Sequence, residues 1–190
     1  MFVETYLQNY AAGHGQRLPP VRSAVGAVKW RPSSENVVKI NFDGALFGES
    51  DYAVLGVVIC NSEGVVLVAL SEKIVKPQIV ELVEILVARH VVLFSIETGF
   101  HNSVFEGDST SVIKHLQDRL VSHSQGGHIL KDIVSRLNSF QSCSFSHVGR
   151  QGNVVALALA QRVRLFFPLE VWTEFVPLAI SSFVLSDLWV

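Results

Sequence analysis

The fold is decided by the stretch VVKINFD at residues 37–43. Hydrophobic and polar residues alternate along it, which is the period of a half-buried β-strand. The hydrophobic face of this strand would carry Val38, Ile40 and Phe42. The opposite face would carry three polar residues, Lys39, Asn41 and Asp43.

Two more strands are predicted immediately downstream. Residues 54–60 and 65–71 are rich in valine, leucine and isoleucine, and the turn sequence NSEG at 61–64 separates them. This composition and spacing are typical of a β-hairpin. The chain therefore begins its folded part with three antiparallel strands in succession.

Helical and strand patterns alternate in the following part of the chain. We expect helices over 78–98, 110–120, 128–140 and 154–163, and strands over 102–106 and 142–148. The first helix is apolar on almost every side and should be buried, and Gly99 suits its C-terminal end. The order predicts an α/β fold with a five-stranded mixed sheet. In it, three antiparallel strands are followed by two parallel ones, with helices on both faces.

The composition is that of one globular domain with two tails. Of 190 residues, 49% are hydrophobic and only 17% are charged, which excludes a disordered chain. We expect a tail or linker at 1–35, the domain at 36–166, and a C-terminal extension at 167–190 that packs on it as a strand or a short helix. The net charge of −2 gives no general attraction for nucleic acid, so phosphate contacts would need a local patch.

The environment of the protein is expected to be the cell interior. The two cysteines, Cys60 and Cys143, lie far apart and form neither a disulfide framework nor a metal-binding spacing. No run of about 18 apolar residues and no secretory signal is present, so no membrane association is expected. The choice between nucleus and cytoplasm stays open, and a monomer is expected.

Three acidic residues stand at the ends of predicted elements. Asp43 closes the first strand, Asp108 follows the strand at 102–106, and Glu84 lies in the first turns of the long helix. The carboxyl ends of parallel strands meet at one edge of a sheet, where α/β proteins bind ligands. Clustered carboxylates suit Mg²⁺ or Mn²⁺, and two such ions can cleave a phosphodiester. Turn formation before a glycine and helix capping are the structural alternatives for the two aspartates.

Five strings in this order resemble a known family. They are KINFDGA at 39–45, GVVICNSEG at 56–64, EILVAR at 84–89, FEGDS at 105–109 and FSHVGRQGN at 145–153. Together they resemble the type 1 ribonuclease H domain of plant non-LTR retrotransposon reverse transcriptases, within the ribonuclease H-like superfamily. The resemblance also takes in Trp30 and the region of Val171 and Trp172.

The resemblance implies an RNA–DNA hybrid ribonuclease with two Mg²⁺ or Mn²⁺ ions, which hydrolyses the RNA strand. It places the metal-binding and catalytic acids on Asp43, Glu84 and Asp108. Glu81, one turn before Glu84 on the same helix face, stays open as the helix carboxylate. The loop histidine of the family falls on His147, for which a structural role inside the fold is the alternative.

Other residues would contact RNA or the RNA–DNA hybrid. Asn41 and Asn153 could reach sugar hydroxyls, and Arg150 could reach a phosphate. Helix capping is the alternative for Asn153, and a solvated surface position is the alternative for Arg150.

One position departs from the family pattern. The fourth acidic position, which is Asp or His in the family, falls on Leu157. Leucine offers no lone pair to a cation, so the second metal site would lose a ligand and activity would be weakened. The alternative function is therefore a catalytically inactive nucleic-acid-binding module or a retroelement remnant.

Overall fold

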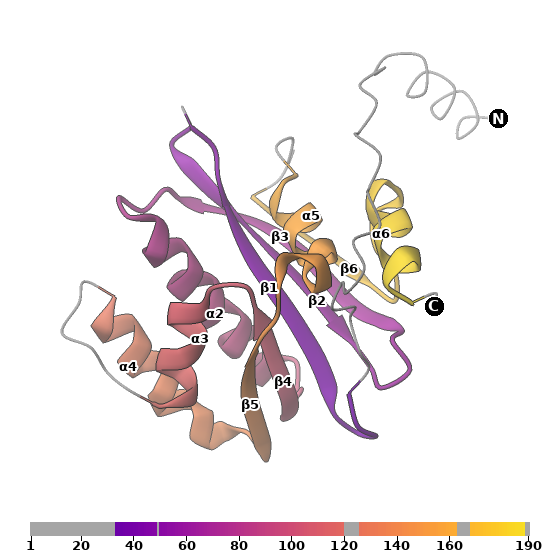
Figure 1. Ribbon diagram of the computed structural model, residues 1–190, viewed down its shortest axis with the longest axis horizontal. Coiled ribbons are helices and arrows are strands. Elements are labelled where there is room, and N and C mark those ends of the chain that lie inside the picture. Colours follow the sequence, from indigo (N-terminus) through magenta and orange to yellow (C-terminus); the bar gives the residue numbers. More distant parts are fainter. Residues whose placement is uncertain (1–32, 49, 120–125, 163–167, 189–190) are drawn as a thin grey trace.

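The computed structural model describes residues 33–48, 50–119, 126–162 and 168–188 (Figure 1). Trp30 and most of the predicted N-terminal tail lie outside the described residues. The described strands form one sheet in the order β5-β4-β1-β2-β3-β6. Their bounds are β1 (Val38–Leu46), β2 (Tyr52–Cys60), β3 (Val66–Val75), β4 (Asn102–Gly107), β5 (Ser142–His147) and β6 (Leu169–Thr173). As predicted, β1, β2 and β3 are antiparallel, and β4 and β5 continue the sheet in parallel with β1.

Helices cover both faces of the sheet, which confirms the predicted layering (Figure 1). One face carries α2 (Val80–Glu97), α3 (Thr110–Gln117) and α4 (Gly127–Arg136), which is extended by the 3-10 turn η1 (Leu137–Ser139). The other face carries α5 (Val154–Ala160), preceded by the 3-10 turn η2 (Arg150–Gly152), and α6 (Leu178–Leu188). None of the helices in the described part of the chain is long and apolar enough to cross a membrane.

The prediction of a five-stranded sheet was wrong, because the sheet has six strands. The sixth strand, β6, comes from the C-terminal extension and pairs antiparallel with the edge of β3. Arg162, which follows α5, contacts two residues of this strand. It forms an ion pair with Glu170 at 2.9 Å, and its guanidinium lies 4.9 Å from the ring centre of Trp172. The sequence left a strand and a short helix open for this extension, because Pro168 and Glu174 interrupt its apolar pattern, and the strand was not counted in the sheet.

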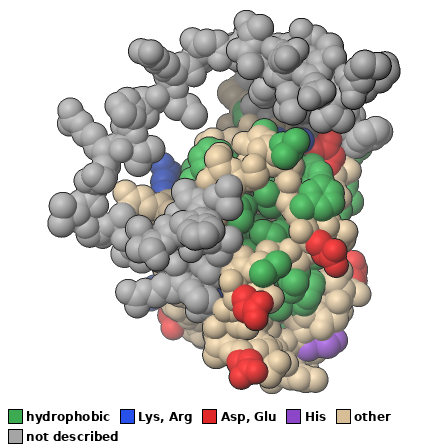
Figure 2. Space-filling model, turned by 90° about the vertical axis from the view of Figure 1, so that its right-hand side faces the viewer, with side chains coloured by type: hydrophobic (Ala, Val, Ile, Leu, Met, Phe, Trp, Pro, Cys, Tyr) green, Lys and Arg blue, Asp and Glu red, His purple; other side chains and the backbone are tan. Residues whose placement is uncertain are grey.

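The side of the molecule near β6 and α6 exposes hydrophobic side chains with acidic ones among them (Figure 2). In β6, Leu169 and Val171 are exposed, because they lie on the face opposite to Glu170 and Trp172. Because side chains alternate along this edge strand, those of one face pack toward α5 and those of the other face contact solvent.

The position of α5 depends on a glycine in β2. A Cβ atom at Gly56 would lie 2.1 Å from the carbonyl oxygen of Ala156 and 2.3 Å from the amide nitrogen of Ala160. Both neighbours are backbone atoms of α5, which cannot rotate away as a side chain can. The helix backbone therefore rests directly on the strand, and a methyl group would push the two apart.

We predict that Gly56→Ala lowers the free energy of unfolding by about 1–3 kcal/mol, the usual cost of overpacking a tight core. Denaturant unfolding followed by circular dichroism measures this. Gly149→Ala is the matched control, because a Cβ there meets nothing within 4 Å and the residue has a φ of −67°. Equal stability of the two variants would contradict this account of α5 packing.

Candidate active site

The candidate site lies where β1 and β4 separate. Their last paired residues are Asn41 and Glu106, whereas β1 continues beside β2 as far as Leu46. Asp43 therefore does not close its strand, as the sequence suggested, but lies two residues beyond the end of the parallel pairing. Asp108 follows the last residue of β4. The two aspartates thus stand at the same opening in the sheet.

Helix α2 crosses β1 at this opening. A Cβ atom at Gly44 would lie 2.5 Å from Cγ1 of Val83 and 3.6 Å from Oε1 of Glu84. The absence of a side chain at Gly44 lets the first turns of α2 approach the strand directly after Asp43. This contact brings the Glu84 carboxylate to the two aspartates.

Asp43, Glu84 and Asp108 form one cluster. One carboxylate oxygen from each residue lies within 4.8 Å of the others. The structure thus brings together the three acids that the sequence singled out. Of the two glutamates left open on α2, Glu84 is the one in the cluster. Glu81 is exposed and accepts a hydrogen bond from Oγ of Ser111 at 3.4 Å.

Two carboxyl groups of this cluster, those of Asp43 and Glu84, bind protons more tightly than ordinary acids. Burial, reinforced by the charge of Asp108, raises the pKa of Asp43 to about 7. Burial also raises the pKa of Glu84 to about 8, with further contributions from the charges of Asp43 and Asp108. The amide of Gly44, which donates to Oδ1 of Asp43 at 2.8 Å, opposes the shift at Asp43. At neutral pH the cluster therefore holds protons unless a cation replaces them.

The cluster fits a hard divalent cation. Oε2 of Glu84 is buried and has no hydrogen-bond partner among the residues that the structure describes. Buried polar atoms normally have a partner, and an orphaned carboxylate oxygen beside two other carboxylates suits a metal ion. Oxygen ligands of Mg²⁺ lie about 2.1 Å from the ion and hence roughly 3–4 Å from one another. Asp43, Glu84 and Asp108 would reach such an ion with small side-chain movements.

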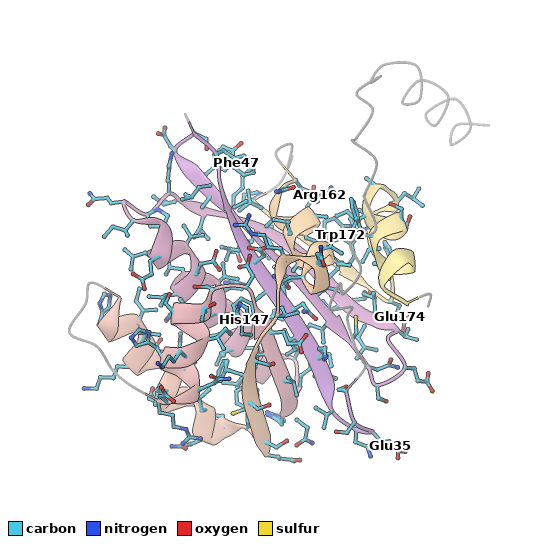
Figure 3. All side chains as sticks on the ribbon, viewed as in Figure 1. Glu35, Phe47, His147, Arg162, Trp172 and Glu174 are labelled. Atoms are coloured by element: carbon cyan, nitrogen blue, oxygen red, sulfur yellow. The ribbon has the colours of Figure 1, made fainter. Side chains whose placement is uncertain are left out.

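Two further predicted residues lie at the rim of the cluster, on the segment that follows Phe145. Nε of Arg150 lies 3.3 Å from Oδ2 of Asp108, and the arginine side chain is 84% exposed. His147 ends β5 (Figure 3), and its Nε2 lies 3.1 Å from the backbone oxygen of Asp108. The loop between them is held by the amide of Val148, which donates to the carbonyl of Gly107 at 3.0 Å. Both side chains are thus at the exposed edge of the site.

The two asparagines predicted to contact nucleic acid are buried. Asn41 is 3% exposed and Asn153 is 1% exposed. Asn153 stands at the N-cap position of α5, but its Nδ2 donates to the carbonyl of Phe42 at 2.9 Å instead of capping the helix. Nδ2 of Asn41 lies 3.3 Å from Oδ1 of Asn153 and 3.1 Å from Oε2 of Glu106. These contacts join β1, β4 and the start of α5. Contact of Asn41 and Asn153 with nucleic acid stays a prediction.

Sequence reasoning missed a buried ion pair in the same network. Nζ of Lys39 lies 2.9 Å from Oε1 of Glu106, and both side chains are about one-tenth exposed. A signal was available, because both residues lie on strands of a sheet that was expected to have helices on both faces, where even the polar face of a strand is buried. Such charges are rarely buried unless they are paired.

Leu157 lies one helical turn after Asn153 in α5, and its amide donates to the Asn153 carbonyl. It is partly buried and belongs to neither core cluster of the described residues. The acidic cluster therefore receives carboxylates from β1, α2 and the β4–α3 junction, and none from position 157.

The raised pKa values predict how stability depends on pH without a divalent ion. A carboxyl with a higher pKa in the folded state stabilises the fold at low pH, and this stabilisation is lost as pH rises toward the folded pKa. Between pH 5 and 8.5, in the presence of a chelator, we expect the free energy of unfolding to fall by on the order of 6 kcal/mol, summed over the two groups. Denaturant titrations across this range measure it.

Glu84→Gln should flatten this pH dependence, whereas Glu81→Gln should leave it unchanged. Added Mg²⁺ should restore stability at pH 8.5 in the wild type. A stability that is constant or rising between pH 5 and 8.5 would contradict the electrostatic description of the cluster.

Comparisons with known proteins agree with this geometry. Residues 41–163 match the family model described as reverse transcriptase-like. A search of curated protein sequences found no match. The ribonuclease H1 of the archaeon Halobacterium salinarum is 26% identical, with a TM-score of 0.56 over 65% of this chain and 94% of that chain.

Two structures of lower identity share the fold. LC11-RNase H1 in complex with an RNA/DNA hybrid is 20% identical, with a TM-score of 0.53 over 64% of this chain and 92% of that one. The foamy viral protease-reverse transcriptase, also in complex with an RNA/DNA hybrid, is 15% identical, with a TM-score of 0.54. This match covers 84% of the present chain and 25% of the viral protein. The chain thus belongs to the reverse transcriptase-like family and carries a ribonuclease H-like domain.

Proposed function

We propose that this protein is a divalent-cation-dependent nuclease that hydrolyses the RNA strand of RNA–DNA hybrids. The observation that carries the proposal is the meeting of Asp43, Glu84 and Asp108 within 4.8 Å at the opening between β1 and β4. Family membership and the hybrid-bound structures of two similar proteins support the substrate class. We expect the protein to act as a monomer inside the cell.

The chain's own residues would prepare the site for this reaction. Bound Mg²⁺ or Mn²⁺ would supply water activation and charge neutralisation at the phosphate. Asp43 and Glu84 must lose their protons to bind a cation, because their pKa values are raised to about 7 and about 8. Asp108 faces solvent in part and would hold the outer side of the site.

His147 is the proposed proton carrier at the rim. A neutral imidazole that donates from Nε2 to the Asp108 carbonyl has its lone pair on Nδ1 and can accept a proton there. Its exposure at the end of β5 would let it exchange this proton with water.

A second candidate function is a hybrid-binding module without turnover. It is favoured by Leu157, because a leucine contributes no ligand where the family has an acidic residue or a histidine. Such a module would bind hybrids in a salt-dependent way and leave the RNA strand intact.

Cleavage of a labelled RNA–DNA hybrid in Mg²⁺ or Mn²⁺ tests the proposal. We expect weak cleavage by the wild type and at least about tenfold faster cleavage by Leu157→Asp. A carboxylate at this position would supply the ligand that the family pattern has there, and a tenfold gain corresponds to about 1.4 kcal/mol of transition-state stabilisation. Asp43→Asn should reduce cleavage at least about a hundredfold. Glu84→Gln should do the same.

Glu81→Gln is the matched control, since it removes a carboxylate from the same helix but outside the cluster, and its rate should equal that of the wild type. If Leu157→Asp also fails to cut, the nuclease proposal is wrong. Retained hybrid binding in that experiment would then support the non-catalytic module.

A further inference from the structure

An arginine side chain lies against the acidic cluster. Arg150 lies in η2, and its Nε is 3.3 Å from Oδ2 of Asp108. Its charge also acts on the Asp43 and Glu84 carboxyl groups and favours their ionised forms. One guanidinium thus acts on all three carboxylates.

The Arg150 backbone is fixed even though its side chain is exposed. The amide of Val148 bonds to Gly107 at 3.0 Å, and the amide of Gly152 bonds to Gly149 at 2.8 Å. These bonds place the start of η2 beside the end of β4. The backbone of Arg150 is therefore anchored within side-chain reach of the cluster. Its ion pair with Asp108 contributes little to the fold, because an exposed ion pair is worth about 0–1 kcal/mol.

Charge balance limits what else this site can hold. Three ionised carboxylates carry three negative charges, and one divalent cation with one guanidinium balances them. A second divalent ion would leave two excess positive charges with no further carboxylate in the cluster to offset them. Adjacent cations that lack shared anionic ligands repel each other strongly in a partly buried site.

We propose that Arg150 takes the place of a second cation, so that Asp43, Glu84 and Asp108 bind a single divalent ion. The inference rests on the proposed function, since it takes the cluster to be a metal site. It also implies that Arg150 weakens binding of the ion it accompanies, because like charges share the same carboxylates.

Ion binding to the intact protein tests this directly. Isothermal titration with MnCl₂ at pH 8.5 and low ionic strength should give one ion per wild-type chain. Arg150→Gln should bind its ion on the order of tenfold more tightly, the effect of removing one charge roughly 6 Å from a divalent ion in water-like surroundings. Arg150→Lys should restore affinity toward the wild-type value, because it keeps the charge.

Arg136→Gln is the matched control, because it removes a partly exposed arginine that pairs with Asp132 on α4. Its Mn²⁺ affinity should equal that of the wild type. Two ions of comparable affinity in the wild type, or unchanged affinity in Arg150→Gln, would overturn the inference while leaving the nuclease proposal intact. Absence of ion binding in the wild type and in every variant would instead refute the metal site itself.

Discussion

The parallel pairing of β1 with β4 ends at Asn41 and Glu106, and the candidate site depends on where it ends. Beyond this point β1 stays in the sheet only through β2, so the side facing β4 is open. Asp43 in β1 and Asp108, which follows β4, each lie two residues past the last pair. A longer parallel ladder would close the gap, and a shorter one would separate the carboxylates. The geometry of a backbone ladder thus sets the distance between charged side chains.

The carboxylates at this opening are electrostatically unfavourable in their ionised forms. Burial and mutual repulsion destabilise the ionised forms of Asp43 and Glu84, which is why both bind protons near neutral pH. The fold tolerates this because the surrounding polar groups are satisfied: Lys39 pairs with Glu106, and Asn153 binds the backbone of β1. Removing one partner of such a buried pair typically costs about 3–5 kcal/mol. Paired buried groups of β1, β4 and α5 therefore surround three carboxylates that could hold a metal ion.

Much of the fold could be predicted from the sequence, because its signals are local. Alternation at 37–43 determined a strand with Asp43 on its polar face, and the apolar stretch at 78–98 determined a buried helix that ends before Gly99. The spacing of hydrophobic residues and the residue types in turns depend only on neighbours in the sequence. They can therefore be recognised without knowing which strands or helices will pack together. The order of strands and helices then fixed the parallel arrangement of β1, β4 and β5 through the handedness of crossovers.

Tertiary structure alone decided which side chains meet. Glu84 rather than Glu81 joins the cluster because α2 packs on Gly44 with the side of the helix that carries Val83 and Glu84. The sixth strand forms because β3 offers an unpaired edge, a property of the assembled sheet and not of the sequence of β6. Arg150 reaches Asp108 across 42 residues of sequence through the end of β5. The sequence thus determined the elements and the candidate acids, whereas the packing angles between elements, set by contacts distant in the chain, decided the site.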